Sequence, residues 1–318
     1  MKVLITGGAG FIGSHLSQVL IQDGHKVTIL DNLSTGSLDN ISQIKDYLNF
    51  ITGDIRNAEL VENQIKNSDL IVHLAAAVGV KNIIERPIES LTTNYNGSEN
   101  ILCAAAKFNK RILIASTSEI YGKNPNQPLS EEDDRVVGNP RILRWSYADA
   151  KALEESLAHA LFLETGLPVT TIRFFNTVGP KQSGNYGMVL PRFVQSAVKG
   201  KDIEIYGSGN QTRVFCHVFD AVEAVSMIIQ KTNTIGQVYN LGGEGEISIN
   251  NLAKLVIERI NSKSNIVHRP YSEVYPPTFE DMQRRVPNIS KIKSALDWKP
   301  IRGIEQIIDD VAFSLTTG

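Results

Sequence analysis

Tyr147 and Lys151 are the first two residues whose types and spacing could do chemistry. They stand four positions apart in Tyr-Ala-Asp-Ala-Lys, so on a helix the phenol and the ammonium lie one above the other. An ammonium that close stabilises a phenolate, and it is expected to lower the pKa of Tyr147 from its usual value of about 10. The pair therefore predicts a base for a hydroxyl proton, although a tyrosine and a lysine at this spacing also occur by chance.

Hydroxyl and carboxylate side chains follow an apolar run that is typical of a strand. The run Arg-Ile-Leu-Ile-Ala-Ser-Thr leads into Thr117, Ser118 and Glu119. Doubly wound folds place their chemistry at the carboxyl ends of parallel strands. We therefore expect these three side chains to be catalytic and to lie near Tyr147.

A glycine-rich turn near the amino terminus predicts a phosphate-binding site. Gly7, Gly10 and Gly13 follow the apolar run Val-Leu-Ile-Thr and precede a segment of helical period. Glycine lets the chain turn tightly and lets the backbone approach a pyrophosphate, while the free N–H groups at the helix start attract the anion. With Phe11 and Ile12, these glycines are expected to bind a dinucleotide. Taken alone, they could equally form a plain turn between a strand and a helix.

Asp31 ends the second predicted strand, where an acidic side chain can accept hydrogen bonds from the adenosine ribose of a dinucleotide. A carboxylate there would repel the 2′-phosphate of NADP, and the first arginine in the chain is Arg56. The expected cofactor is therefore NAD. Other residues near the strand ends are expected to contact it or else to pack there: Asn32, Thr35, Gly36, Asp54, Ile55, Leu74, Ala75, Ala76 and Asn94.

The elements that must hold these residues follow from the alternation of short apolar runs with longer segments of helical period. That alternation predicts an α/β fold, a Rossmann-type doubly wound parallel sheet, over residues 1–175 with a returning segment near 212–241. Glycine and proline become frequent after about residue 176, which indicates a smaller α/β substrate domain over 176–318. A buried helical stripe is predicted at Leu153, Ser156, Leu157, Ala160 and Leu161.

Composition narrows the classes of partner and compartment. The 318 residues carry 32 Lys+Arg against 34 Asp+Glu, so no nucleic-acid partner is expected. No segment resembles a secretory signal or contains about 18 uninterrupted apolar residues, so we expect a soluble, cytoplasmic protein without a membrane partner. Cys103 and Cys216 are expected to be buried free thiols. The six histidines show no metal-ligand spacing, and no metal is expected.

Taken in order, these motifs resemble the extended short-chain dehydrogenase/reductase family that modifies nucleotide sugars. The resemblance rests on the glycine turn, Asp31-Asn-Leu-Ser-Thr-Gly36, the Thr-Ser-Glu strand end, Tyr-x-x-x-Lys, and later segments such as Tyr206-Gly-Ser-Gly-Asn-Gln-Thr-Arg213. It implies that NAD takes a hydride from C4 of the sugar while Tyr147 takes the hydroxyl proton. It also implies that Thr117 bonds to that hydroxyl and that Lys151 holds the nicotinamide ribose.

The 4-keto sugar that results could be processed in several ways. The Thr117-Ser118-Glu119 segment resembles that of UDP-glucuronate decarboxylases, and we expect that activity, with Glu119 assisting proton handling beside C5 and C6. A UDP-sugar 4-epimerase is the alternative, because many of them share the segment from Asp31 to Gly36. A 4,6-dehydratase and a non-catalytic NAD-binding protein are further alternatives. Lys181 stands where family members that act on uronates usually carry arginine.

The resemblance also implies contacts to a nucleotide-sugar substrate, expected to be UDP-linked. Arg213 and Arg285 are expected on its diphosphate, since a guanidinium matches phosphate oxygens. Asn176 is expected near the diphosphate or the sugar, and Tyr206 beside the base. The remaining expected contacts are Lys81, Lys181 and Arg192. Without the resemblance, each arginine would be expected to be a solvated surface charge.

Two predicted helices, near 91–106 and 147–164, carry apolar residues on more faces than a sheet can cover. A second copy would cover them by packing the same two helices into a four-helix bundle, as family members commonly do. We therefore expect a homodimer, with coverage by the second domain as the alternative. The apolar residues in question are Leu91, Tyr95, Ile101, Leu102, Ala105, Leu153, Leu157, Ala160 and Leu161.

Overall fold

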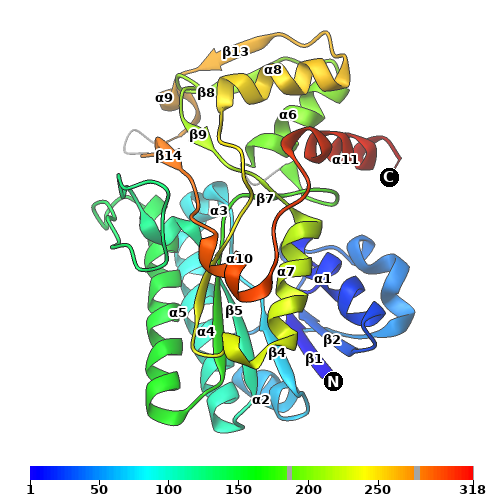
Figure 1. Ribbon diagram of the computed structural model, residues 1–318, viewed down its shortest axis with the longest axis vertical. Helices are drawn as coiled ribbons and strands as arrows, with labels where there is room; N and C mark the ends of the chain where they lie inside the picture. Colours follow the sequence, from blue (N-terminus) through cyan, green and yellow to red (C-terminus); the bar gives the residue numbers. More distant parts are fainter. Residues whose placement is uncertain (185–187, 276–279, 318) are drawn as a thin grey trace.

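A seven-stranded parallel sheet forms the body of the protein, in a computed structural model that describes residues 1–184, 188–275 and 280–317, without the side chains of 80–82 and 317. The strand order is β11-β6-β5-β4-β1-β2-β3. The sheet and the helices that cover it make up the lower part of Figure 1. The strands are β1 (Lys2–Thr6), β2 (Lys26–Asp31), β3 (Leu48–Thr52), β4 (Leu70–His73), β5 (Arg111–Thr117), β6 (Val169–Phe174) and β11 (Val238–Leu241). The predicted doubly wound α/β fold is confirmed.

The order of the strands changes direction beside β1. The chain runs outward from β1 to β3 and then returns to build β4 and β5 on the other side. In doubly wound folds ligands bind at this change of direction, outside the carboxyl ends of the strands. The turn after β1 and the residues after β5 therefore meet at one edge of the sheet.

Helices cover both faces of the sheet, and most of them bury an apolar side against it. In α1, Leu16 and Leu20 stand one turn apart and are fully buried. One face carries α1 (Phe11–Gln22), η1 (Leu38–Tyr47), α7 (Val218–Gln230) and α10 (Ser290–Leu296). The other face carries α2 (Ala58–Lys66), α4 (Pro87–Lys107) and α5 (Arg144–Thr165).

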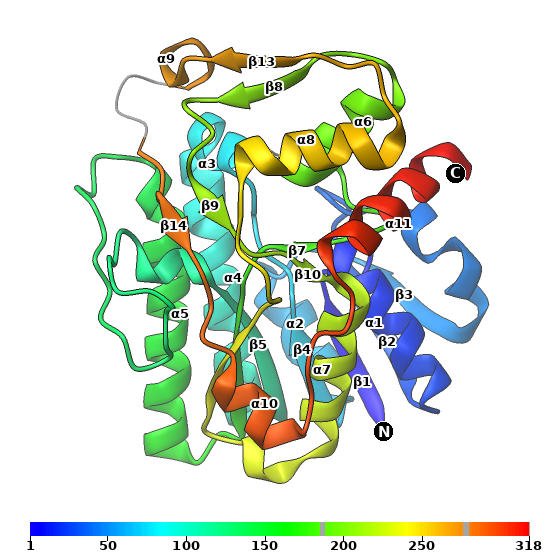
Figure 2. The ribbon, with the colours of Figure 1, turned by 45° about the horizontal axis from the view of Figure 1, so that its top comes forward.

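A smaller lobe lies beyond the carboxyl ends of the strands and has a core of its own (Figure 2). Its helices are α6 (Val189–Val198), α8 (Ile249–Ile260), α9 (Tyr271–Val274) and α11 (Ile304–Thr317). Its strands are β7 (Thr177–Val178), β8 (Ile203–Tyr206), β9 (Thr212–Arg213), β10 (Cys216–His217), β12 (Ile247–Ser248), β13 (Ile266–Arg269) and β14 (Arg284–Arg285). The short connecting helices are α3 (Val80–Glu85), η2 (Ser118–Tyr121) and η4 (Thr232–Thr234).

The chain passes between the two lobes more than once. After β10 it returns to the sheet through α7 and β11, and β11 pairs in parallel with β6. After β14 it returns again, and Ile292 and Trp298 are buried in the core shared with α1 and α7. These crossings hold β14 beside the end of β5, where the predicted catalytic residues lie (Figure 2).

The predicted buried stripe on α5 is wrong. Leu153 is 49% exposed, and Ser156 and Ala160 are exposed, whereas Leu157 and Leu161 are partly buried. The buried side of α5 instead carries small and polar residues: Ala148, Lys151, Ala152, Glu154 and Ala158. Small residues there let α5 pack closely on α4 and β5, so the apolar period did not mark the inward face.

Two further findings concern the cysteines and the helices. Cys216 is buried as expected, but Cys103 is exposed, because it lies on the outer side of α4. The expectation of a second buried thiol is therefore wrong. Within the described ranges, none of the helices combines the length and apolar content that crossing a bilayer requires.

Candidate active site

A cavity of about 890 Å³ lies at the carboxyl ends of the sheet strands, and both lobes contribute to its wall. The glycine turn and Asp31 line it from the sheet side, as do Tyr147 and Lys151 of α5. Arg213 and Arg285 line it from β9 and β14. This volume is near the upper end of the range of about 300–1,000 Å³ that is typical of small-molecule pockets. The cavity therefore suits a ligand larger than one sugar ring.

The glycine turn packs tightly against neighbouring backbone and leaves the start of α1 open to the cavity. Gly7 has a φ of +74°, and a Cβ there would lie 2.7 Å from the backbone nitrogen of Ala75. A Cβ on Gly13 would meet the Gly7 carbonyl oxygen. Helix α1 begins at Phe11, its N-cap residue Gly10 has no side chain to cap it, and Phe11, Ile12 and Gly13 line the cavity. The N–H groups of its first turn are therefore available to a pyrophosphate.

Asp31 forms a small cradle beside this turn. Its carboxylate accepts hydrogen bonds from the backbone N–H groups of Ala9 at 3.0 Å and Leu33 at 2.8 Å. Burial raises the pKa of Asp31, and the two backbone hydrogen bonds oppose that rise. Each bonded oxygen keeps further acceptor capacity toward the cavity, which fits the vicinal hydroxyls of a ribose. The residues present thus fit a dinucleotide.

Most of the other residues expected at the cofactor line the cavity: Asn32, Thr35, Ile55, Leu74, Ala75 and Ala76. Three do not. Asp54 is bound by Arg56, at 2.7 Å and 2.9 Å, and by Asn32 at 2.9 Å. Gly36 packs against the backbone of Ala9. Asn94 bonds to both backbone groups of Ala77: its side chain accepts from the N–H at 2.7 Å and donates to the carbonyl at 3.1 Å. It therefore holds the loop after β4 in place and does not itself line the cavity.

Thr117, Tyr147 and Lys151 come together as the sequence predicts. Thr117 ends β5, and its hydroxyl accepts a hydrogen bond from the N–H of Glu119 at 3.2 Å. This bond caps the amino-terminal end of η2. Thr117 also shares a hydrogen bond with Tyr147. The Lys151 ammonium donates to the Ala115 carbonyl and to Glu154, both at 2.8 Å.

The expected effect of Lys151 on Tyr147 is wrong for this structure. Burial raises the pKa of Tyr147, the carboxylates of Glu154 and Glu119 raise it further, and the hydrogen bond from Thr117 opposes them. The ammonium of Lys151 is paired with Glu154, so its charge is largely offset at the phenol. Tyr147 is therefore a neutral phenol at physiological pH.

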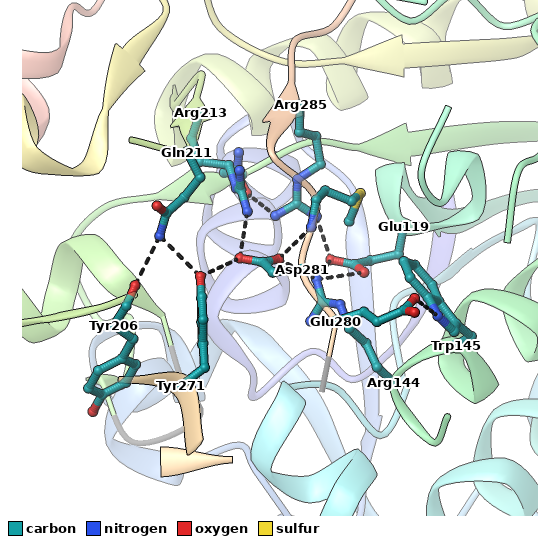
Figure 3. Close-up of polar contacts among 12 residues, drawn as sticks. Glu119, Arg144, Trp145, Tyr206, Gln211, Arg213, Tyr271, Glu280, Asp281 and Arg285 are labelled. Carbon is teal, nitrogen blue, oxygen red and sulfur yellow. Dashed lines mark hydrogen bonds and ion pairs between the residues drawn. The ribbon is translucent and has the colours of Figure 1, made fainter. Parts of the chain in front are cut away.

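A buried network of alternating charges occupies one side of the cavity (Figure 3), and its member Glu119 lies near enough to Tyr147 to raise the pKa of that phenol. Glu119 is paired with Arg285 and, at 3.3 Å, with Arg144. Asp281 is paired with Arg144 at 3.1 Å and with Arg213 at 3.0 Å. Burial opposes ionisation of Glu119, but Arg144 and Arg285 outweigh it and lower the pKa of Glu119 to about 2. Glu119 is therefore a carboxylate and not a resting acid.

The residues expected at the substrate occupy the second half of the cavity: Asn176, Lys181, Arg192, Tyr206, Arg213 and Arg285 all line it. Asn176 accepts from Arg285 at 2.8 Å, and the Arg192 guanidinium lies 4.0 Å from the Tyr206 ring centre. Lys181 donates to the carbonyl of Asn40 at 2.7 Å. The side chain of Lys81, which belongs to α3, lies outside those the structure describes.

Sequence reasoning missed three residues of the site. Arg144 precedes Tyr147 by three positions, so one turn of α5 places both at the cavity, and that spacing could have signalled it. Glu154, by the same rule, follows Lys151 by one turn. Asp281 gave no local signal, because its partners Arg144 and Arg213 are distant in sequence.

Known proteins match this chain over nearly its full length. The family model described as GDP-mannose 4,6 dehydratase matches residues 4–311. A UDP-N-acetyl-alpha-D-glucosaminuronate decarboxylase of Bacillus cytotoxicus is 43% identical over 96% of this chain and 94% of its own length. A UDP-glucuronic acid decarboxylase of Xenopus tropicalis is 36% identical over 96% of this chain and 70% of its own.

Solved structures of other proteins agree with the fold. A UDP-glucose 4-epimerase of Thermotoga maritima, solved with UDP-glucose, has a TM-score of 0.90 at 27% identity and covers 99% of each chain. A dTDP-glucose 4,6-dehydratase of Bacillus anthracis, solved with NAD, has a TM-score of 0.87 at 28% identity, covering 100% of this chain and 97% of that one. With its glycine turn, its tyrosine and lysine, and this full-length match, the chain belongs to the GDP-mannose 4,6-dehydratase family of extended short-chain dehydrogenases/reductases.

Proposed function

We propose that this protein is an enzyme that removes CO2 from a UDP-linked uronic acid, with NAD as its cofactor. The observation that carries the proposal is the convergence of Arg144 and Arg285 on Glu119, beside Tyr147. Two buried guanidinium groups at the reacting sugar suit a substrate with a carboxylate at C6, since a guanidinium pairs with a carboxylate through two parallel hydrogen bonds. The two decarboxylases among the relatives support it.

The cofactor would be held by residues that already form its cradle. The first turn of α1 would bind the pyrophosphate, Asp31 the adenosine ribose, and Lys151 the nicotinamide ribose. Lys151 has three N–H donors and uses two of them within the chain, at Ala115 and Glu154. When bound, NAD supplies reversible oxidation at C4 of the sugar.

Tyr147 is the proposed base for that oxidation. Because it rests as a neutral phenol, Tyr147 must first release its own proton to solvent. The phenolate then takes the proton of the C4 hydroxyl as the C4–O bond becomes a ketone, and Thr117, which bonds to Tyr147, orients the same hydroxyl. The ketone is then β to the C6 carboxylate. When the C5–C6 bond breaks, its electron pair moves toward the ketone oxygen as an enolate and CO2 leaves. C5 then takes a proton, and reduction at C4 returns the proton of Tyr147 to the oxygen.

The charges around Glu119 define its role in this sequence. Because Arg144 and Arg285 keep it ionised, Glu119 cannot be the resting donor of the proton that C5 takes. It is placed to hold a water that donates this proton, and the two arginines offset its repulsion toward the substrate carboxylate. They also stabilise the negative charge of the enolate.

The remaining cavity residues would bind the UDP part of the substrate. Arg213 is the proposed partner of the diphosphate, and it would exchange Asp281 for phosphate oxygens. Tyr206, stacked by Arg192, would line the base. Lys181 is held by Asn40, so recognition of the C6 carboxylate would rest on Arg144 and Arg285 instead.

The proposal is tested by offering the purified protein NAD with UDP-glucuronate, with UDP-N-acetylglucosaminuronate, or with UDP-glucose. We expect one of the two uronates to give a UDP-pentose that lacks the mass of CO2, and UDP-glucose to remain unchanged. A uronate product with its mass retained and C4 inverted would identify an epimerase instead. Turnover of UDP-glucose alone would exclude a role for the arginines in carboxylate binding.

We also propose that the protein is a homodimer assembled through α4 and α5. Each helix carries exposed apolar residues, with Leu91 40% exposed on α4, and Leu153 49% and Leu163 68% exposed on α5. Part of the apolar set is covered within the chain, because Ile101, Leu102 and Ala105 are buried in its own core. A twofold axis would pair the remaining surface with itself.

A further inference from the structure

Glu154 is a buried carboxylate directly beneath the proposed catalytic pair. Its side chain is 1% exposed and that of Lys151 is 2% exposed, and the two are joined by an ion pair of 2.8 Å. Position 154 lies one turn after Lys151 and two turns after Tyr147 on the inner side of α5. Elsewhere on the same side of the helix, Ala148 and Ala158 are buried without any charge. The carboxylate therefore needs a reason other than helix packing.

The surroundings of Glu154 contain few opposing charges. Ser98 of α4 donates to its Oε2 at 2.9 Å, and His73 of β4 contacts Ser98 at 2.9 Å from behind. Burial lowers the pKa of His73 to about 3, so this histidine is uncharged. Burial raises the pKa of Glu154, the Lys151 ammonium and the Ser98 hydroxyl oppose that rise, and the negative charge of Glu155 on α5 adds to it. Lys151 is thus the cation that Glu154 faces.

One oxygen of Glu154 lacks a hydrogen bond. Oε2 receives both Lys151 and Ser98, whereas Oε1 is buried with no hydrogen-bond partner among the described residues. A buried carboxylate with one bare oxygen is costly for a fold to keep. Buried ionisable groups whose pKa is shifted, as that of Glu154 is, are enriched at functional sites.

We propose that Glu154 is a positioning residue that holds the Lys151 ammonium, offsets its charge, and so sets the pH at which Tyr147 gives up its proton. In this arrangement Lys151 is fixed by Ala115 and Glu154 and presents its third donor to the cavity. Tyr147 faces two negative charges, Glu154 from its own helix and Glu119 from η2, and one hydrogen-bond donor, Thr117. The direction of the Tyr147 pKa agrees with this arrangement.

The inference rests on the proposed function for its catalytic meaning, because Tyr147 is the base only if the C4 hydroxyl is oxidised. The effect of the Glu154 charge on the pKa of Tyr147 does not depend on a substrate. Removing the negative charge of Glu154 favours the phenolate, so it must lower the pKa of Tyr147. An activity that requires the phenolate would then rise at lower pH.

The first test is a titration of tyrosinate by ultraviolet absorbance in the protein without substrate. The chain has nine tyrosines, so the signal of Tyr147 is obtained by subtracting the titration of the matching Tyr147→Phe protein. We expect Glu154→Gln, which keeps the shape and the acceptor, to lower the midpoint of Tyr147 by about one pH unit or more. Glu154→Asp keeps the charge and should stay close to the natural protein.

The second test is the pH profile of turnover with NAD and the uronate substrate. The acid limb should move to lower pH in Glu154→Gln, and Glu154→Asp should restore it. Glu164→Gln is the matched control, because Glu164 is an exposed glutamate on the same helix, and its profile should be unchanged. A purely structural role would lower turnover at every pH without moving the limb.

An unchanged midpoint in Glu154→Gln would overturn the proposal, and so would a shift to higher pH, which would mean that Lys151 loses its charge together with Glu154. If Glu154→Gln does not fold, Glu154→Ala takes its place, because it removes the same charge and leaves the small side chain that Ala148 and Ala158 carry on this side of α5. It should also shift the midpoint of Tyr147 to lower pH, and no shift would again overturn the proposal. Failure of the proposed function would show differently, as absent turnover of uronates with the titration shift intact.

Discussion

The guanidinium of Arg285 contacts the carboxylate of Glu119, although 166 residues separate the two in the sequence. Arg285 lies on β14 of the smaller lobe and Glu119 directly after β5 of the sheet, so this ion pair joins the lobes at the site itself. Arg144 meets the same carboxylate from α5. Three arginines on this wall of the cavity thus share two carboxylates, those of Glu119 and Asp281. The positive charge that is left over suits an anionic ligand.

Replacing Arg144 should weaken binding of uronates selectively. We expect Arg144→Met to raise the Kd for UDP-glucuronate about tenfold or more, since a hydrogen bond between charged groups contributes about 1.5–3 kcal/mol. The Kd for UDP-glucose, which lacks the carboxylate, should change little. Calorimetry on the NAD-loaded protein measures both.

The matched control for Arg144 is Arg141→Met, three positions earlier and exposed. It should leave both affinities unchanged. An equal loss of both ligands in Arg144→Met would assign Arg144 to the diphosphate instead, and no loss at all would remove it from the binding site.

Glu119→Gln should separate cofactor binding from turnover. The amide keeps the shape of the carboxylate and lies away from the glycine turn, so the affinity for NAD should be unchanged. Turnover should fall by roughly 10²-fold or more, which is the usual contribution of a group that handles protons in catalysis. Calorimetry with NAD and product formation measure the two effects, and near-normal turnover would show that Glu119 only holds the arginines.

The site residues that could be predicted from sequence are those defined by short spacing. The glycine turn, Asp31, and the pair of Tyr147 and Lys151 each depend on a few consecutive residues of one strand or helix, whose geometry is regular. Contacts between residues that are distant in the sequence could not be predicted from such spacings. Asp281 and Arg144 meet only because the chain returns from the smaller lobe, and no local pattern encodes that contact.

The face of α5 shows why apolar period alone misled. Leu153 faces outward while Lys151 and Glu154 are buried, the reverse of the usual rule for charged residues. The buried charges pair with each other, which offsets part of the penalty of burial, and small alanines fill the space around them. The same pairing explains why Lys151 does not lower the pKa of Tyr147 as its spacing suggested.

Gly13→Ala should block the cofactor site. Its new Cβ would meet the carbonyl oxygen of Gly7 and lie 2.7 Å from the Cα of Gly8, so the turn before α1 must move. We expect NAD affinity to fall at least tenfold and the free energy of unfolding to fall by about 1–3 kcal/mol. Gly303→Ala is the control, because its Cβ would lie no closer than 3.3 Å to other atoms. Unchanged NAD binding would remove the turn from the cofactor site.

The proposed dimer is tested by light scattering at low micromolar concentration. The natural protein should have about twice the mass of the 35.0 kDa chain. Leu153→Lys, on the exposed face of α5, should shift the population toward the single chain, because a buried unpaired charge opposes association. A natural protein that is monomeric and fully active would contradict the dimer.

The central claim is most directly tested by following C6 of the substrate. A UDP-linked uronate carrying a carbon isotope at C6 is incubated with the protein and NAD, and nuclear magnetic resonance follows the label. We predict that the label leaves the nucleotide sugar as CO2 or bicarbonate, with one equivalent of UDP-pentose formed. A label that stays in a nucleotide sugar whose C4 has inverted would contradict decarboxylation.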